Sequence, residues 1–198
     1  MSHLPFESDA RRAGYSLIAG IDEAGRGPLA GPVIAAAVIL PENARLEGIR
    51  DSKQMTSRAR EDAFFRIEKQ AISAAVAVIG PREIEQINIL QAARKAMKQA
   101  VLYLDPPPDL LLIDGTHYLD LPIRQRCIVR GDQQCISISA ASVLAKVYRD
   151  RIMCSYHELY PHYGFSSNKG YGTPGHLAAI VRHGPCSIHR LTFRGVIR

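Results

Sequence analysis

The amino-acid sequence predicts an α/β fold with a mixed sheet and a helical C-terminal portion. Short apolar runs with the composition of buried strands alternate with longer segments whose apolar residues recur at helical spacing. The chain has 198 residues, of which 46% are hydrophobic, which is enough to bury the core of one domain. We therefore expect a single domain over residues 16–198, after a segment at 1–15 to which the sequence assigns no role.

Residue type and spacing define each element in turn. Apolar, β-branched or alanine-rich runs of four to nine residues predict strands, and a Gly/Pro-rich turn separates the first two. Capping residues and apolar positions three or four apart predict helices, and the prolines at 106–108 end the second helix. The expected elements are strands at 16–21 and 33–40, a helix from Thr56 or Ser57 to about Gln70, a strand at 71–79, a helix from 84 toward 104, strands at 110–113 and 127–130, and a helix at 139–153.

Charge is distributed unevenly along the chain. The formal net charge is +6, yet the residues through Asp120 hold 14 Lys and Arg against 16 Asp and Glu. From Leu121 onward the count is 11 against 3. An acidic partner such as nucleic acid should therefore lie mainly against the C-terminal part, whose basic helical region we place at about 151–198. A merely solvated basic surface is the alternative interpretation.

Other classes of protein fit the sequence less well. The longest apolar run spans only residues 33–40, far short of the roughly 18 residues that a membrane span requires. The four cysteines include no CxxC pair, so neither a disulfide framework nor a zinc site is indicated. His157 and His162 lack acidic or cysteine partners at ligand spacing. We expect a cytoplasmic monomer with free thiols and no membrane contact.

Carboxylates occur where apolar segments end. Asp22 and Glu23 follow the first strand, Asp114 follows the strand at 110–113, and Asp150 lies toward the end of the last long helix. Adjacent side chains on a regular strand point to opposite faces, so Asp22 and Glu23 share one site only if the strand ends or bulges between them. We expect the following glycine-rich residues to supply that break. Taken singly, a residue such as Asp114 before a glycine is most often part of a turn, and one such as Asp150 between two arginines is most often half of a surface ion pair.

Clustered carboxylates repel one another and raise one another's pKa values unless a cation lies among them. Mg²⁺ and Mn²⁺ prefer oxygen ligands and retain water molecules for chemistry. Two such ions can activate an attacking water and stabilise the leaving oxygen of a phosphodiester. The acidic residues therefore point to a hard divalent ion as the cofactor.

A long motif and a series of shorter ones resemble a known family. Residues 21–33, which read IDEAGRGPLAGPV, are similar to the signature of bacterial ribonuclease HII, a type 2 ribonuclease H. Together with this motif the resemblance spans positions 18 to 193. The further matches, in order, are Asp51-Ser52-Lys53, residues 87–92, Leu112-Ile113-Asp114-Gly115, Gly131-Asp132, Ser139-Ala140-Ala141-Ser142, Ala145-Lys146-Val147, Arg149-Asp150, Lys169-Gly170-Tyr171, Thr173, His176, His189-Arg190 and Phe193.

The resemblance implies a ribonuclease H-like mixed sheet flanked by helices, with a helical C-terminal extension. It implies a metal-dependent endonuclease that cuts the RNA strand of RNA/DNA hybrids and cuts at ribonucleotides embedded in duplex DNA, leaving 5′-phosphate and 3′-hydroxyl ends. The catalytic and metal-binding residues that it implies are Asp22, Glu23, Asp114 and Asp150, with Asp132 as a rival to Asp150. The substrate-binding residues that it implies are Gly25, Arg26, Gly27, Lys53, Lys146 and Tyr171.

Two other functions compete with this one. A nucleic-acid-binding protein without catalysis would use the basic C-terminal part, but four acidic residues beside an anionic ligand oppose binding. A metal-dependent phosphatase for small esters explains the carboxylates but not the extended basic region. The local chemistry favours a nuclease, because the glycines around Arg26 let the backbone approach a sugar whose 2′-hydroxyl distinguishes RNA from DNA.

Overall fold

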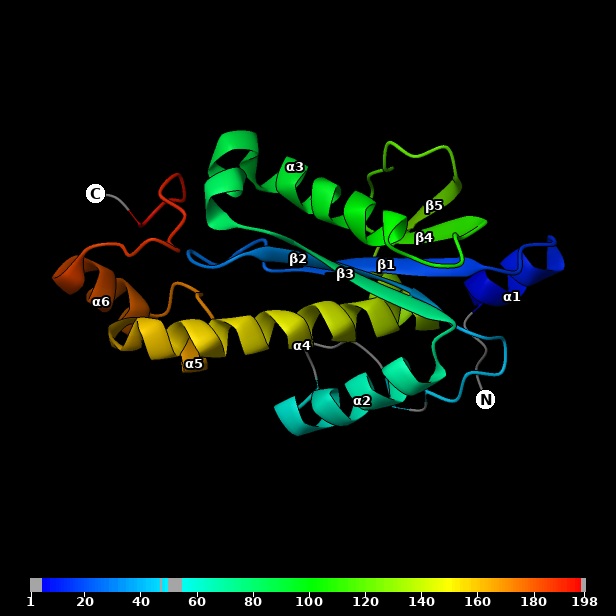
Figure 1. The fold of residues 1–198 in the computed structure, drawn as a ribbon, viewed down its shortest axis with the longest axis horizontal. Coiled ribbons are helices and arrows are strands. Elements are labelled where there is room, and N and C mark those ends of the chain that lie inside the picture. Colours follow the sequence, from blue (N-terminus) through cyan, green and yellow to red (C-terminus); the bar gives the residue numbers. More distant parts are fainter. Residues whose placement is uncertain (1–4, 47, 50–54, 197–198) are drawn as a thin grey trace.

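The computed structural model describes residues 5–46, 48–49 and 55–196, and within them a five-stranded sheet has the strand order β3-β2-β1-β4-β5 (Figure 1). β1 pairs antiparallel with β2 and parallel with β4, so the sheet is mixed, and the fold class predicted from the sequence is confirmed. The outer pairings are antiparallel for β2 with β3 and parallel for β4 with β5. The strands are β1 (Ile18–Ala24), β2 (Val33–Ile39), β3 (Ser73–Ile79), β4 (Leu110–Asp114) and β5 (Arg124–Ile128).

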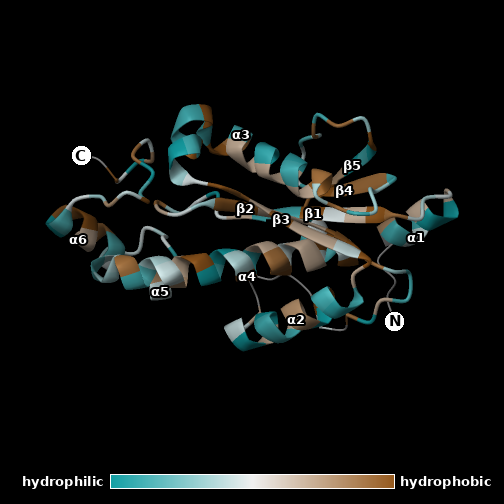
Figure 2. Cartoon of the chain, viewed as in Figure 1, coloured by the Kyte–Doolittle hydropathy of each residue, from teal (hydrophilic) through white to brown (hydrophobic). Residues whose placement is uncertain are grey.

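Helices cover both faces of this sheet. α3 (Pro81–Leu102) lies on one face, and α2 (Ser57–Gln70) and α4 (Ile136–Leu159) lie on the other (Figure 1). The alternation of side chains along β1 and β2 separates the core into two layers. Residues such as Ile21 pack toward α3, whereas Ile34 packs toward α2 and α4. Figure 2 shows hydrophobic residues concentrated along the strands and along the part of α4 beneath them.

Several boundaries differ from those expected from the sequence. The strand expected at 16–21 is longer in the structure, because β1 continues to Ala24 while β2 supplies a partner for every residue from Ala19 onward. The expected break between Asp22 and Glu23 is therefore wrong, and the glycine-rich residues follow the strand only after Ala24. α4 is also longer than the expected helix at 139–153, so Asp150 lies within it rather than near its end. β5 begins at Arg124 instead of Cys127, since its partner β4 pairs with it from Leu110.

The N-terminal segment contains a helix that the sequence did not predict. α1 (Pro5–Arg12) places the Glu7 carboxylate against the first turn of α4. Glu7 Oε1 accepts hydrogen bonds from Ser137 N at 3.0 Å and Ser137 Oγ at 2.8 Å. The residue that precedes α4, Cys135, makes no side-chain cap of its own. The N-terminal segment thus satisfies a backbone donor at the start of α4.

The C-terminal region packs around a buried pair of histidines, His176 on α6 (Pro174–His183) and His189 beyond it. Cys186 N donates to His189 Nδ1 at 2.9 Å, so the His189 proton is on Nε2. Nε2 of His189 lies 3.0 Å from Nε2 of His176, whose Nδ1 lies 2.8 Å from the carbonyl of Tyr171. One set of tautomers therefore satisfies these three hydrogen bonds while both rings are neutral.

α4 approaches β1 most closely at Gly20. A Cβ atom at this position would lie 2.1 Å from Ser137 C and 2.3 Å from Ile138 N. Real Cβ atoms do not approach backbone atoms this closely, and both contacts belong to a regular helix that cannot move alone. The glycine at this position of β1 therefore determines how near the start of α4 lies to the sheet.

We predict that Gly20→Ala destabilises the fold. Overpacking a rigid core costs about 1–3 kcal/mol and occasionally more, and the clash here is with backbone. Gly175→Ala is the matched control, because a Cβ at Gly175 meets nothing within 4 Å in the first turn of α6. Urea unfolding followed by circular dichroism measures both variants. A Gly20→Ala midpoint equal to that of the wild type would contradict the packing described.

We also predict that the His176–His189 pair makes stability depend on pH. Burial and the neighbouring His176 lower the pKa of His189 to about 4, and burial lowers that of His176. Because an unfolded histidine takes up a proton near pH 6.5, the folded state loses stability as the pH falls from there toward 4. Between pH 7.5 and 5, the wild type should lose about 1–2 kcal/mol more than His189→Gln does.

Denaturant unfolding at several pH values between 7.5 and 5 measures this difference. His183→Gln is the control, since His183 is an exposed histidine at the end of α6 and should leave the pH dependence of the wild type unchanged. Parallel stability curves for the wild type and His189→Gln would show that the buried pair does not titrate on unfolding.

Candidate active site

The register of two parallel strands places Asp22 beside Asp114. Ile21 on β1 is aligned with Ile113 on β4, so the next residue of each strand is a carboxylate. Both carboxylates lie on the α4 face of the sheet. Ser142 of α4 donates a hydrogen bond to Asp22, and Ile138 of α4 packs with Leu112, two residues before Asp114. The carboxyl ends of these strands therefore form an acidic centre.

Glu23 joins this centre from the next position of β1. Its side chain starts on the opposite face, and its Oε1 atom lies 3.2 Å from Nη1 of Arg26 in an ion pair. The backbone N–H of Glu23 donates to Asp22 Oδ1 at 2.7 Å. The charges of Glu23 and Asp114 both act on Asp22, although no bulge separates the two adjacent carboxylates. Asp22 and Glu23 are the last residues of β1 before Ala24, so their carboxylates lie near the end of the strand.

Burial and like charge perturb these carboxylates. Burial, followed by the charges of Glu23 and Asp114, raises the pKa of Asp22 well above its usual value. Burial also raises the pKa of Glu23, while Arg26 opposes the shift. Asp22 is only 5% exposed, so its charge is poorly solvated. The Asp22 carboxyl group therefore requires either a proton or a nearby cation.

The two candidates for a fourth carboxylate have different surroundings. Asp150 is held by two cations, with Lys146 Nζ at 2.6 Å and Arg60 Nη1 at 3.1 Å. It lies eight residues beyond Ser142 on α4, a distance of about 12 Å along the helix axis. Asp132 is buried next to Gly131, whose N–H donates to Asp114 Oδ1 at 2.7 Å.

The chemistry of this donor set suits a hard divalent cation, because carboxylate oxygens are the ligands that Mg²⁺ and Mn²⁺ prefer. In the described part of the chain, however, no three His, Cys, Asp or Glu side chains are grouped as ready metal ligands. Glu23 is turned toward Arg26, and one oxygen each of Asp22 and Asp114 accepts a backbone N–H. The carboxylates are adjacent but engaged by hydrogen bonds within the protein.

The Gly-Arg-Gly turn follows β1 directly. Gly25 has a φ of +101°, and a Cβ there would lie 2.3 Å from Arg149 Nε, so only glycine fits. Gly27 lies next to Tyr171, because a Cβ atom at Gly27 would be 3.8 Å from Cε1 of the Tyr171 ring. Tyr171 is 46% exposed, which leaves part of its ring open to solvent. Four of the residues expected to contact substrate, Gly25, Arg26, Gly27 and Tyr171, therefore lie together beside the carboxylates.

The two lysines expected near substrate phosphates have different outcomes. Lys53 lies outside the described residues, and the prediction for it stays a prediction. Lys146 is half-buried on α4 and paired with Asp150, and burial lowers its pKa. The sequence motifs include Ser142 and Arg190, but no role was predicted for either residue. For Ser142 the available signal was a polar residue within an apolar run, whereas no local pattern marks Arg190.

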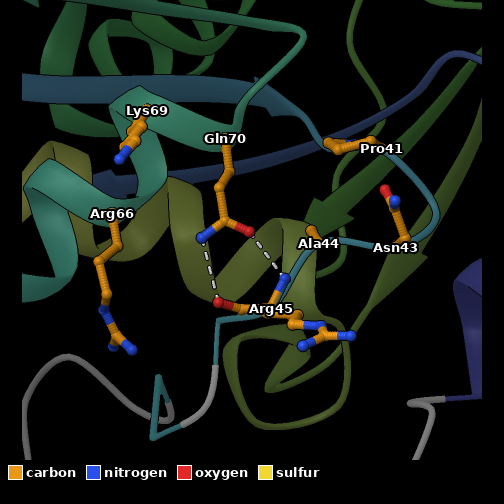
Figure 3. Close-up of a pocket in the computed structure, with 7 residues that line it drawn as sticks. All are labelled: Pro41, Asn43, Ala44, Arg45, Arg66, Lys69 and Gln70. Carbon is orange, nitrogen blue, oxygen red and sulfur yellow. Dashed lines mark hydrogen bonds between the residues drawn. The ribbon is translucent and has the colours of Figure 1, made fainter.

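A surface hollow at the other end of the sheet is separate from this site. Arg45, Arg66 and Lys69 line it, and the Gln70 amide exchanges hydrogen bonds of 2.8 and 3.1 Å with the backbone of Arg45 (Figure 3). β2 ends at Ile39, opposite Ala19 near the start of β1, so the hollow lies away from the carboxylates.

No helix in the described part of the chain is long and apolar enough to span a membrane.

Solved structures share the fold. The ribonuclease H2 of Pyrococcus horikoshii matches with a TM-score of 0.77 and 27% identity, over 90% of this chain and 94% of its own. A ribonuclease HIII in complex with Mn²⁺ matches with a TM-score of 0.70 over 94% of this chain and 70% of its own, and at 18% identity it supports the fold alone.

Sequence comparison is more specific. Residues 19–196 match the family Ribonuclease HII. The ribonuclease HII of Geobacter sulfurreducens is 56% identical, over 96% of this chain and 88% of its own length. The ribonuclease HII of Syntrophobacter fumaroxidans is 53% identical, over 99% of this chain and 84% of its own length. With the acidic centre and the glycine-rich turn at the positions of the family motif, the chain belongs to the ribonuclease HII family and is a ribonuclease H hydrolase.

Proposed function

We propose that this chain is a divalent-metal-dependent endonuclease that hydrolyses the RNA strand of RNA/DNA hybrids and cuts at ribonucleotides embedded in duplex DNA. The products would carry 5′-phosphate and 3′-hydroxyl ends, and the activity would serve ribonucleotide removal. The observation that carries this proposal is the pairing of Asp22 with Asp114 at the carboxyl ends of adjacent parallel strands, with Glu23 beside them.

Mg²⁺ or Mn²⁺ fits this site because the carboxylates are buried, mutually repulsive and made of hard oxygen donors. Asp22, Glu23 and Asp114 would hold the cofactor. A pair of divalent ions supplies an activated water for attack on the phosphodiester and stabilises the leaving 3′-oxygen. Arg26, whose guanidinium lies 3.2 Å from Glu23 Oε1, would meet a phosphate of the substrate beside these carboxylates.

Substrate recognition is proposed for the turn at Gly25, Arg26 and Gly27 together with Tyr171. The two glycines let backbone N–H donors reach a 2′-hydroxyl, which is the group that distinguishes RNA from DNA. The exposed ring of Tyr171 lies beside Gly27, where it can stack on the sugar next to the ribonucleotide. Lys53 and Lys146 remain proposed phosphate contacts, and the excess of basic residues after Leu121 supports a nucleic-acid partner.

The contacts support Asp132 over Asp150 as the fourth carboxylate. Asp150 is occupied by Lys146 and Arg60. Asp132 follows the glycine that hydrogen bonds to Asp114. Asp150, which the motif first suggested, is then a residue that positions Lys146. Cleavage by the Asp132→Asn and Asp150→Asn variants decides which of the two is the fourth carboxylate.

One assay tests the proposed function. The purified chain is incubated with Mg²⁺ or Mn²⁺ and three duplexes of one sequence: all DNA, DNA with a single ribonucleotide, and an RNA/DNA hybrid. We expect cleavage of the second and third but not of the first, and none in the presence of a chelator. Cleavage of the all-DNA duplex at the same rate, or no cleavage of either ribonucleotide substrate, would contradict the proposal.

We predict that Asp22→Asn and Asp114→Asn abolish cleavage while leaving hybrid binding largely intact. Each change removes a charged oxygen ligand but no basic residue, and the loss should exceed the roughly 10–100-fold typical of residues that only support metal ligands. Initial cleavage rates and fluorescence anisotropy measure the two properties. Asp62→Asn, an exposed position on α2, is the matched control. Full activity in either site variant would refute the assignment.

Asp132→Asn and Asp150→Asn separate the two candidates for the fourth carboxylate. If Asp132 contributes to the acidic centre, its variant should lose cleavage by roughly 100-fold or more at saturating substrate. Asp150→Asn leaves Lys146 and Arg60 without their shared partner, so it should change KM more than kcat. The opposite pattern, with kcat lost only in Asp150→Asn, would restore Asp150 to the fourth place.

A further inference from the structure

Arg190 is fully buried, and its guanidinium is surrounded by backbone carbonyls of the turn after β1. Nη2 donates to Gly25 O at 2.6 Å, and Nε donates to Gly31 O at 2.9 Å. Nη1 donates to two carbonyls, Pro28 O at 2.8 Å and Arg26 O at 3.1 Å. One side chain from near the C-terminus therefore holds four carbonyls of a single turn that lies far earlier in the chain.

A second buried arginine lies next to the first. Arg149 of α4 donates to Pro32 O at 3.1 Å, Ala30 O at 3.1 Å and Lys169 O at 2.9 Å. In the described residues neither guanidinium forms an ion pair. Burying a charge without a carboxylate is costly, so the carbonyl contacts are what make these two positions tolerable. Such an arrangement calls for a role beyond packing.

Peptide geometry shows which groups Arg190 leaves available. In a trans peptide the carbonyl points opposite to the N–H of the next residue. Because the carbonyls of Gly25 and Arg26 point at Arg190, the N–H groups of Arg26 and Gly27 point away from it. Neither N–H donates to another described residue, and Gly27 lies beside the exposed Tyr171 ring. Two oriented backbone donors therefore border the carboxylates.

We propose that Arg190 is a positioning residue for ribonucleotide selection: it fixes the carbonyls of Gly25 and Arg26 so that the N–H groups of Arg26 and Gly27 face the 2′-hydroxyl of the substrate. This inference rests on the proposed function and adds to it the group that orients the selective turn. Free N–H donors in a glycine-rich turn would otherwise lose much of their selectivity, because the turn would have several conformations.

The shape of the guanidinium suits this role. Its five donors form a rigid planar fork, and the four carbonyl contacts converge on its three nitrogens. Lysine retains the charge but carries its three donors on one nitrogen, which cannot reach carbonyls spread from Gly25 to Gly31. The neighbouring residue, His189, adds to the attachment through its bridge with Ala30 of the same turn.

The first test measures binding without cleavage. With a chelator present, dissociation constants are determined for a duplex with one ribonucleotide and for the same duplex made of DNA only. Two hydrogen bonds to a 2′-hydroxyl give the wild type a preference of about tenfold or more. In Arg190→Lys the preference should fall to about one while affinity for the all-DNA duplex stays within about twofold. Cleavage at the ribonucleotide should fall about 100-fold.

Two control variants separate positioning from general stability. Arg82→Lys changes an exposed arginine on α3 and should leave the preference unchanged. Gly20→Ala is the destabilising control, because its clash is with Ser137 and Ile138 at the start of α4 and not with the turn that Arg190 holds. It should lower thermal stability as Arg190→Lys does and still retain most of the preference. Equal loss of preference in Gly20→Ala and Arg190→Lys would overturn the proposal.

A further test uses the wild-type protein and therefore does not depend on whether a variant folds. In nuclear magnetic resonance spectra, the amide signals of Arg26 and Gly27 should shift more with the ribonucleotide duplex than with the all-DNA duplex. The carbonyl carbons of Gly25 and Arg26 should remain nearly unchanged, because Arg190 already holds them. Large carbonyl shifts would overturn the inference. A wild type without any preference would instead contradict the proposed function, and a preference that survives in Arg190→Lys would refute this inference alone.

Discussion

The packing of α4 along β1 is the constraint on which the rest of the structure depends. The two elements touch at Gly20, where Ser137 is closest, and again at Gly25, where Arg149 lies against the backbone. Five residues of extended chain cover about 17 Å. Twelve residues of helix cover about 18 Å. Helix and strand therefore run side by side in step, and between these two contacts Ser142 of α4 meets Asp22 of β1.

This alignment separates opposite charges within a small volume. The carboxylates of Asp22 and Asp114 lie at the strand ends, and the guanidiniums of Arg149 and Arg190 lie under the adjacent turn. Burial and the nearby Arg149 lower the pKa of Arg190 to about 9, whereas burial and like charge raise that of Asp22. Hydrogen bonds to backbone carbonyls hold the two guanidiniums at the turn, apart from the carboxylates. An anionic backbone can then be attracted to the turn while cations are attracted to the carboxylates.

Local patterns predicted most of the fold, and non-local pairing determined what they missed. The strands and helices were recognisable because apolar period and turn residues are short-range signals. The continuation of β1 to Ala24 was not, because it depends on pairing with β2. The acidic centre could be predicted as residue types, yet the adjacency of Asp22 and Asp114 came from strand register. The choice between Asp132 and Asp150 depends on contacts across the chain that no local pattern encodes.

The attachment of Arg190 to the turn at residues 25–31 has a consequence for the order in which the protein becomes competent during synthesis. The turn leaves the ribosome early, and the side chain that orients it is added among the last residues of the described chain. Strands, carboxylates and α4 can assemble beforehand, because domains fold as their segments emerge. The turn cannot make these four carbonyl contacts until the chain has been made as far as Arg190. A chain that has been made only as far as α4 would thus hold Asp22 and Asp114 while the turn still lacks the side chain that fixes its carbonyls.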